Sequence, residues 1–275
     1  MEFVERDGVL CATDAFQDMQ QAGLVHFSDF MEFPGGARIV HKRGRSVFRF
    51  EIGDRAFYLK RNRLHRTELF KQLSRGKLPP RSARQEWTSI QAVSQAGIPT
   101  VKPVAFGERI FFGIETASFT VTEELYGAHP LDELVYDKFN GPEKFHEKRA
   151  LIRQLAGLAR HLHGAGMNHQ DFYLNHFFLG EDNELFLLDL QRVQRRACTP
   201  EYSIIKDLAQ LAFSARRFPF ITRSDHLRFL LAYLGESRLS RGSRRLLTRV
   251  GRKAERIARH DIKLTARRRA RGEMK

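Results

Sequence analysis

A chain of 275 residues with 42% hydrophobic residues can bury a large core as one domain or two lobes, which excludes a fully disordered protein and a small disulfide scaffold. Its two cysteines, Cys11 and Cys198, are too few for a disulfide framework or a cysteine zinc site, and its apolar runs fall far short of the roughly 20 residues that cross a bilayer, so we expect a cytosolic or membrane-surface protein. The net charge of +15 favours partners that carry phosphate or carboxylate groups.

The first predicted elements lie between residues 38 and 60. Three segments alternate apolar and polar residues and are separated by glycine: Arg38–Arg43, Ser46–Ile52 and Arg55–Lys60. This pattern predicts an antiparallel meander of three strands. A basic run follows over Arg61–Arg84, with eight Arg or Lys residues and Glu68 as its only acid.

A helix is predicted over Ala83–Gln95, because apolar residues recur at helical spacing and Gly97 and Pro99 end the pattern. Three further strands are predicted over Val101–Phe106, Ile110–Ile114 and Ser118–Thr122. Residues 1–125 are therefore expected to form a β-rich lobe with one main helix. This lobe ends in a connecting segment near residues 122–125.

Beyond Leu125 the pattern changes from strands to helices. A long amphipathic helix is predicted over Pro142–Gly164, and a hairpin over Phe177–Leu179 and Leu185–Leu188. The remaining helices are predicted over Ser203–Ala215, Asp225–Leu234 and Ser240 to about Ala266. We therefore predict a two-lobed α+β fold, in which the small antiparallel sheet lobe is followed by a mostly helical lobe, residues 126–275.

The end of the chain carries most of the charge. Ser237–Lys275 contains 15 Arg or Lys and 3 Asp or Glu residues, a net charge of +12. Such a stretch attracts nucleic acid, anionic lipid or an acidic protein, and charge alone does not choose among them. Three consecutive arginines, Arg267 to Arg269, on a helical tail are typical of an anionic surface.

The residues best suited to chemistry lie in the irregular segment before the hairpin. His169-Gln170-Asp171 is followed by Asn175-His176 and then by Asp189, which lies 18 residues after Asp171. A protein-kinase catalytic loop has the same order, with a catalytic Asp and then a metal-binding Asp. Phosphoryl transfer needs one carboxylate beside the attacking hydroxyl, a second on magnesium, and a cation on the phosphates.

The cation is expected from the third strand of the first lobe. Lys60 ends that strand, and Glu86, 26 residues later on the predicted helix, can hold it in place. The segment from Thr120 to Leu125 then occupies the position between the lobes, where an extended backbone can bind an adenine edge. Because four elements occur in the kinase order, we predict ATP-dependent phosphoryl transfer with magnesium.

The chain resembles the bacterial lipopolysaccharide core heptose kinases of the WaaP and InaA family from about Arg38 to His260. The matching motifs are Arg84-Gln85-Glu86-Trp87, Ala117 to Leu125, Gly166 to Asp171 with Tyr173 to Phe177, Asp189-Leu190-Gln191-Arg192 and Lys206-Asp207-Leu208. The resemblance implies a protein-kinase-like fold and ATP as phosphoryl donor. It also implies an inner-core heptose of a lipid A-linked oligosaccharide as acceptor, and a cytoplasmic enzyme that is peripheral on the cytosolic face of the inner membrane.

The resemblance also implies roles for individual residues. Asp171 becomes the catalytic base, and Lys60 with Glu86 the phosphate-binding pair. His176 and Asp189 fall on the magnesium or phosphate side, with His176 where protein kinases have Asn. The cofactor-binding set is Lys60, Glu86, Glu123 and Leu125.

Two departures from the kinase pattern matter. Gln170 stands where Arg is usual, which argues against switching by a phosphorylated activation loop. Only Gly44 remains of a glycine-rich phosphate loop, so a basic turn with Arg43 and Arg45 is a candidate for phosphate contacts, and its role stays open. Asp207 is expected to accept amide hydrogen bonds from the catalytic loop.

The sequence leaves alternatives to a heptose kinase. Within the kinases, the acceptor could be Kdo or a protein side chain. A non-catalytic nucleic-acid-binding protein would explain the charge, but the chain lacks a recognisable RNA or DNA motif. A pseudokinase is disfavoured because Lys60, Asp171 and Asp189 are all present. An acidic protein partner is compatible with the basic tail.

Overall fold

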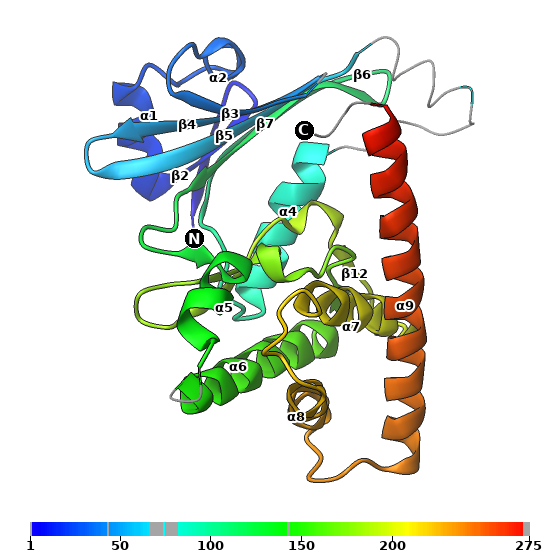
Figure 1. The fold of residues 1–275 in the computed structure, drawn as a ribbon. Coiled ribbons are helices and arrows are strands. Elements are labelled where there is room, and N and C mark those ends of the chain that lie inside the picture. The colour runs from blue at the N-terminus through cyan, green and yellow to red at the C-terminus, as the bar shows by residue number, and fades with distance from the viewer. Residues whose placement is uncertain (1, 43, 66–73, 75–81, 142–143, 272–275) are drawn as a thin grey trace. The chain divides into compact units, whose positions relative to one another are not determined.

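The structure is a computed structural model that describes residues 2–42, 44–65, 74, 82–141 and 144–271. The chain divides into two compact units (Figure 1). Unit 1 comprises Met1–Gln95, Thr100–Tyr126 and Asp189–Gln191, and unit 2 comprises Ala96–Pro99, Gly127–Leu188 and Arg192–Lys275.

Unit 1 is built on a seven-stranded sheet in which all neighbouring strands are antiparallel. The strand order is β1-β2-β6-β7-β5-β4-β3. The strands are β1 (Phe3–Arg6), β2 (Val9–Ala12), β3 (Ala37–Lys42), β4 (Arg45–Ile52), β5 (Arg55–Arg63), β6 (Pro103–Phe111) and β7 (Ile114–Glu123). The predicted meander is therefore confirmed as β3, β4 and β5, and it forms one side of a larger sheet.

The prediction of a separate strand over Ile110–Ile114 is wrong. Phe112 and Gly113 form the turn between β6 and β7, and both have positive φ angles, 46° and 77°. Residues 110–114 are mostly Ile and Phe, which are typical of a strand. Gly113 alone indicates a turn in this sequence. Two long strands replace the three short ones.

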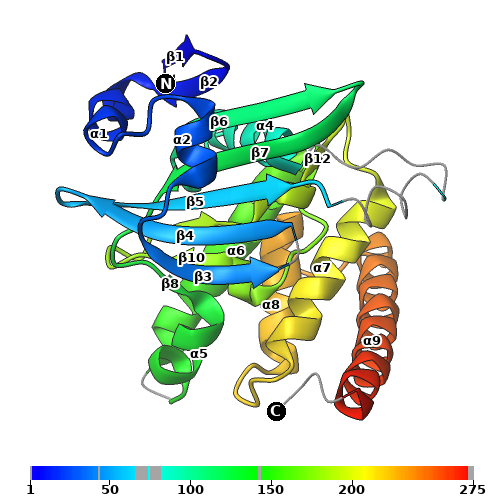
Figure 2. The same ribbon diagram turned by 90° about the horizontal axis from the view of Figure 1, so that it is seen from above.

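Helices cover the two faces of the sheet differently (Figure 2). The short helices α1 (Phe16–Gln21) and α2 (Phe27–Glu32) pack with alternate strand residues into the main core, where the Phe30 and Phe119 rings stack with centroids 4.3 Å apart. On β6, Ala105 belongs to this core, and the next residue, Phe106, points to the other face of the sheet. There it packs against Trp87 of α4 (Ser82–Gln95). This alternation follows from the two-residue period of a strand. The predicted helix over Ala83–Gln95 is confirmed as α4.

Unit 2 is mostly helical. It contains a three-stranded sheet of order β11-β10-β8 and a two-stranded pair, β12-β9. The strands are β8 (His129–Pro130), β9 (Met167–Asn168), β10 (Phe177–Leu179), β11 (Leu185–Leu187) and β12 (Gln194–Arg195). The helices are α5 (Leu131–Phe139), α6 (Phe145–Gly164), α7 (Glu201–Ala215), α8 (Arg223–Leu234) and α9 (Arg241–Ala270). Every helix predicted beyond residue 142 is present, whereas α5 was not predicted.

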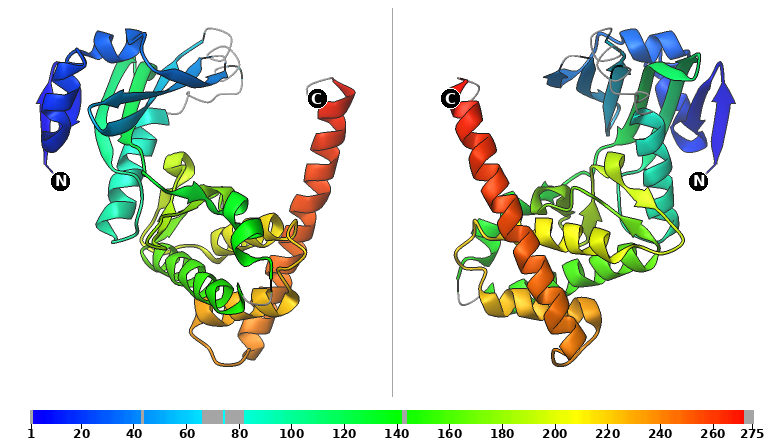
Figure 3. Two further views of the ribbon diagram at one scale, coloured as in Figure 1. Left: turned by 60° about the vertical axis from the view of Figure 1, so that its left-hand side comes forward. Right: turned by 90° about the vertical axis from the view of Figure 1, so that its right-hand side faces the viewer.

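The last helix, α9, has 30 residues and is about 45 Å long. It begins at the cap Ser240, whose Oγ accepts a hydrogen bond from the Ser243 N–H at 3.1 Å. Its buried residues, Ser243, Val250 and Ala254, all lie in its first half, which packs on α7. Figure 3 shows the second half extending beyond the other helices of unit 2.

Candidate active site

The predicted phosphate-binding pair is formed in unit 1. Lys60 on β5 forms an ion pair with Glu86 on α4, through Nζ and Oε1. The Glu86 side chain is only 3% exposed. A buried carboxylate needs charged or hydrogen-bonding partners. Lys60, 26 residues earlier in the sequence, supplies such a partner for Glu86.

The second oxygen of Glu86 is also engaged. Its Oε2 accepts a hydrogen bond from Gln191 Nε2 at 3.0 Å, and Thr120 Oγ1 lies 3.5 Å away. Gln191 lies two residues after Asp189, which is exposed and has a positive φ angle of 57°. The Lys60–Glu86 pair and the segment that carries Asp189 are thus connected inside unit 1.

The predicted adenine-binding segment, residues 120–125, is held by two arginines. Arg55 hydrogen-bonds Glu123 at 2.8 and 2.9 Å, and this bond lowers the pKa of the Glu123 carboxyl although its partial burial opposes the shift. Arg49 binds Glu124 in the same way and lowers its pKa. The side chain of Glu123 is therefore occupied by Arg55. The backbone N–H groups of Glu123 and Glu124 bond to carbonyl groups of unit 1, whereas that of Leu125 makes no backbone hydrogen bond within the described residues.

The predicted catalytic base lies in the loop of unit 2 that follows β9. Both carboxylate oxygens of Asp171 accept hydrogen bonds from Arg192 Nη1, at 2.8 and 2.9 Å. Arg192 is 57% exposed, so its guanidinium can exchange partners with an incoming anion. Arg192 belongs to a motif of the sequence, but no role was predicted for it.

The two histidines of the loop are anchored to backbone carbonyls. His176 Nδ1 lies 2.6 Å from the carbonyl oxygen of Asp171, and His169 Nε2 lies 2.9 Å from that of Leu188. Because a carbonyl only accepts, each of these ring nitrogens carries the proton. His169 therefore organises the loop, and the His176 ring is fixed beside Asp171.

One face of α7 holds the backbone of the loop. Asp207, which is fully buried, accepts hydrogen bonds from the N–H groups of His169 and Gln170 at 2.7 and 2.9 Å. One turn further, Gln210 bonds to the N–H of Phe172 and to the carbonyl of Gln170. The predicted role of Asp207 is confirmed. The positive φ of Gln170, 69°, is stabilised by these bonds.

Asp207 is also linked to α8. His163 of α6 lies between Asp207 and the Tyr233 hydroxyl, with ring nitrogen distances of 3.4 and 2.9 Å. Burial raises the pKa of Tyr233 to about 12, and the negative charge of Asp207 adds to the shift. This buried series of hydrogen bonds connects three helices to the loop that carries Asp171.

A second cation lies close to the loop. Lys206 Nζ donates a hydrogen bond to Gln170 Oε1 at 3.4 Å. Burial lowers the pKa of Lys206 and nearby Arg192 lowers it further, while Asp171 acts in the opposite direction. Arg192 and Lys206 thus place positive charge around Asp171, which is the electrostatic setting for a phosphoryl group.

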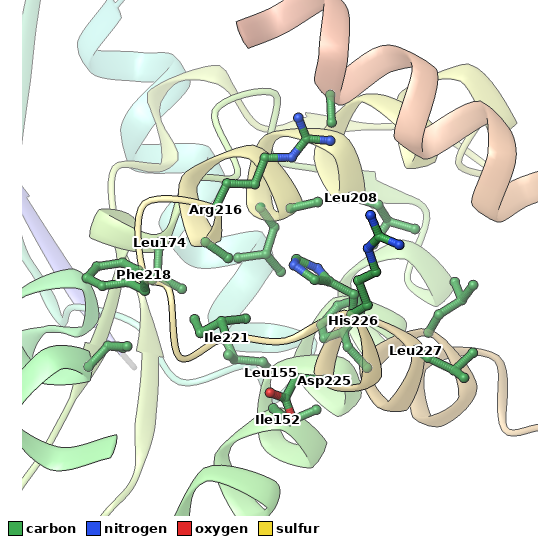
Figure 4. A pocket seen from close by; sticks show the side chains of 18 of the residues that line it. Ile152, Leu155, Leu174, Leu208, Arg216, Phe218, Ile221, Asp225, His226 and Leu227 are labelled. Atoms are coloured by element: carbon green, nitrogen blue, oxygen red, sulfur yellow. The ribbon is translucent and has the colours of Figure 1, made fainter. Parts of the chain in front are cut away.

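Unit 2 also contains an apolar cavity of about 770 Å³ (Figure 4). Aliphatic side chains such as Ile152, Leu155 and Leu208 line most of it. Leu174, three residues after Asp171, is part of the same wall. His226 faces the cavity, and its pKa is lowered by burial and by Arg216.

Most of the predicted basic run lies outside the residues that the structure describes. Arg66, Lys71, Arg75, Lys77 and Arg81 lie outside the described residues, and so does Arg43. The three remaining members are used inside unit 1. Arg61 is buried and bonds to the Phe33 carbonyl, Arg63 bonds to the Met31 carbonyl, and Arg84 pairs with Glu108.

Comparison with known proteins identifies the family. Residues 37–233 match the lipopolysaccharide kinase (Kdo/WaaP) family. The chain belongs to this family. It is 38% identical over 227 residues to the lipopolysaccharide core heptose(I) kinase WaaP of Pseudomonas aeruginosa, covering 78% of this chain and 83% of that protein. It is 34% identical to the enzyme of the same name from Escherichia coli (strain K12), covering 70% of this chain and 75% of that protein.

A solved structure described as WaaP in complex with acyl carrier protein is similar throughout. It has a TM-score of 0.71 and 31% identity, with 93% of this chain and 99% of that chain covered. The predicted family and the kinase-like α+β fold are confirmed. The chain is therefore a phosphotransferase of a lipopolysaccharide kinase family, and kinases of this family use ATP.

Proposed function

We propose that this chain transfers the γ-phosphoryl group of ATP to a hydroxyl of a heptose in the lipopolysaccharide inner core. The observation that carries the proposal is the Asp171 loop, held by Asp207 and faced by Arg192, in a chain 38% identical to a named core heptose(I) kinase. The charges around this loop match what phosphoryl transfer requires.

Each residue then has a defined role. The Asp171 carboxylate accepts the proton of the heptose hydroxyl as its oxygen bonds to the γ-phosphorus and the bond to the bridging oxygen of ADP breaks. Lys60, held by Glu86, binds the phosphates of the nucleotide. Arg192 and Lys206 balance negative charge on the transferred group. The Leu125 N–H and the backbone of Glu123 bind the adenine edge.

The described residues also fit a magnesium ion that arrives with ATP. They contain no cluster of three His, Cys, Asp or Glu side chains that could hold a metal ion. Magnesium bound to a nucleotide needs only one or two protein ligands, because phosphates and water supply the rest. Asp189 of unit 1 is an exposed residue, and by itself it is a candidate ligand. His176 of unit 2 has its Nδ1 anchored on a carbonyl in the manner of metal-binding histidines, and it is a separate candidate. When bound, the ion would neutralise charge on the phosphates.

An acceptor panel tests the proposed function. Purified chain is incubated with ATP, magnesium and one of three acceptors: dephosphorylated core glycolipid, Kdo-lipid A without heptose, or a generic protein substrate. We expect transfer only to the acceptor that contains heptose. Transfer to Kdo or protein would assign the enzyme to the alternative acceptors, and nucleic-acid binding without any transfer would support the non-catalytic alternative.

We also propose that the enzyme works on the cytosolic face of the inner membrane, with the second half of α9 on anionic lipid. No helix among the described residues is long and apolar enough to cross a membrane. Arg267, Arg268 and Arg269 are exposed at the end of α9. Each Arg near an anionic leaflet gains about 1 kcal/mol of binding energy.

Replacing Arg267, Arg268 and Arg269 with Ala is expected to weaken binding to anionic vesicles on the order of 100-fold at low salt. The apparent KM for membrane-embedded acceptor should rise, while a delipidated soluble acceptor is phosphorylated as before. The matched control removes three arginines from the first turns of the same helix: Arg241, Arg244 and Arg245. Equal losses in both variants would mean that net charge, and not the end of α9, controls binding.

An acidic carrier protein is a second proposed partner. The solved relative is described as a complex with acyl carrier protein, and α9 offers the complementary charge. The aliphatic cavity in unit 2 has the chemistry to accept a hydrocarbon chain. The α9 variants distinguish the two partners, since loss of carrier binding with unchanged vesicle binding would assign the end of α9 to the protein.

A further inference from the structure

The β6–β7 hairpin of unit 1 ends in an unusual turn. Phe111 pairs with Ile114, so Phe112 and Gly113 form a two-residue loop. Both have positive φ angles, 46° and 77°, which is the geometry of a type I′ turn. Asn or Asp followed by Gly is the preferred sequence for such a turn, and an aromatic residue in the first position is an outlier.

The other described residues with positive φ and a side chain are all polar. They are Asp7, Gln170, Asn183 and Asp189. Gln170 and Asp189 lie in segments of the proposed active site, and Asp7 and Asn183 lie in the hairpin connections β1–β2 and β10–β11. The presence of Phe at the turn therefore calls for a functional reason.

Phe112 is almost fully exposed, and its neighbours extend the apolar surface. Phe112 is 89% exposed and Phe111 65%, with their rings edge to face at a centroid distance of 4.5 Å. Ile110, on the same strand, is 40% exposed. A Cβ added to Gly113 would meet no atom of the described residues within 4 Å. The tip is a convex apolar knob.

A row of arginines lies behind this knob. Arg63 of β5 and Arg109 of β6 both pair with Ala117 of β7, which places them on one row of the sheet. Both are exposed, and both contact α2 on the same face, through the Met31 carbonyl and the Phe27 ring. Aromatic side chains at a tip with basic residues behind them match a bilayer interface, where rings enter the acyl boundary and cations stay among the headgroups.

We infer that the hairpin tip, Ile110–Ile114, inserts into the interface of an anionic bilayer and anchors unit 1 there. The inference rests on the proposed function, because that function requires a membrane-embedded glycolipid acceptor. A lipid surface is favoured over a protein because the tip is convex and its cationic row is complementary to anionic headgroups. The hairpin tip and α9 would bind the membrane by different forces. Burial of apolar rings supplies the binding energy of the tip, and salt does not screen this energy as it screens the charges of α9.

Replacing Phe112 with Asn tests the anchor against a structural role. Phe112→Asn supplies the preferred type I′ sequence, so the melting temperature should stay the same or rise. Partition into vesicles of phosphatidylethanolamine and phosphatidylglycerol should fall about tenfold, in high as well as low salt. Tyr202→Asn, which removes an aromatic side chain that is 64% exposed on α7, is the matched control and should leave partition unchanged.

A tryptophan probe gives an independent readout. The chain has one tryptophan, Trp87, which is 4% exposed, so its fluorescence in the parent should ignore lipids with brominated acyl chains. In Phe112→Trp, the fluorescence of the new indole should be quenched by those lipids and not by vesicles of unbrominated lipids. Absence of quenching, or unchanged partition of Phe112→Asn, would overturn the inference.

Activity on a soluble heptose acceptor separates this inference from the proposed function. Phe112→Asn should phosphorylate that acceptor at the parental rate, because the tip contacts no reacting group. If the parent itself transfers no phosphate to any heptose acceptor, the proposed function fails whatever the vesicles show. If transfer is normal and the tip does not bind lipid, only the anchor fails.

Discussion

Replacing Asp171 with Asn is expected to reduce phosphoryl transfer by roughly 10² to 10⁴-fold. The amide cannot accept the proton of the acceptor hydroxyl, so the loss should appear in kcat. The substitution keeps the shape of the side chain and a hydrogen bond to Arg192, so the melting temperature and ATP affinity should change little. Steady-state kinetics, thermal melting and nucleotide titration measure the three quantities.

Two other carboxylates of unit 2 provide the controls for this variant. Asp261→Asn changes an exposed carboxylate on α9 and should leave every measurement unchanged. Asp207→Asn alters a buried acceptor of two loop N–H groups, so it should lower the melting temperature as well as activity. Turnover of Asp171→Asn within about twofold of the parent would remove Asp171 from the mechanism.

Lys60 and Glu86 are expected to act as one unit. Lys60→Met should lower kcat/KM on the order of 10² to 10³-fold, because it removes a preorganised cation from the phosphates. Glu86→Gln should cause a similar loss, since the Lys60 ammonium would no longer be held. The double variant should then be little worse than the more damaged single variant.

A double-mutant cycle with a second ion pair controls for charge and stability. Arg249 and Glu201 form an exposed ion pair in unit 2, and their substitution with Met and Gln should leave activity nearly unchanged. Melting curves are needed for each Lys60 and Glu86 variant, because Glu86 is buried and loss of its partner destabilises the fold. Multiplicative losses for Lys60 and Glu86 would show that they work independently.

The parts of the fold with strong local signals could be predicted from the sequence. Glycines separate the meander strands β3 to β5, and α4 ends at Gln95, two residues before Gly97. The hydrophobic period and the glycine positions therefore predict the same element boundaries there. The elements α1 and α2 have six residues each and were not predicted, because so short a helix shows no clear period. Their stability comes from packing on the sheet, as the stacked rings of Phe30 and Phe119 show.

Some residues of the candidate site could likewise be predicted from the sequence, and others could not. Lys60 with Glu86, and Asp207 with the loop amides, could be predicted because their motifs occur in kinase order. Arg192 and Lys206 were not given roles, since an Arg or Lys near a motif looks like any surface charge until the fold places it beside Asp171. The contact of Gln191 with Glu86 spans 105 residues, and no local pattern encodes it.

The measurement that tests the central claim most directly is the position of the transferred phosphate. Purified chain is given ATP, magnesium and a dephosphorylated inner-core glycolipid, and the product is examined by phosphorus–proton correlation NMR. The new phosphorus signal should correlate with a ring proton of heptose in the product of the parent and be absent with Asp171→Asn. A phosphate on Kdo, or release of inorganic phosphate with no modified sugar, would contradict the assignment of this chain as a heptose kinase.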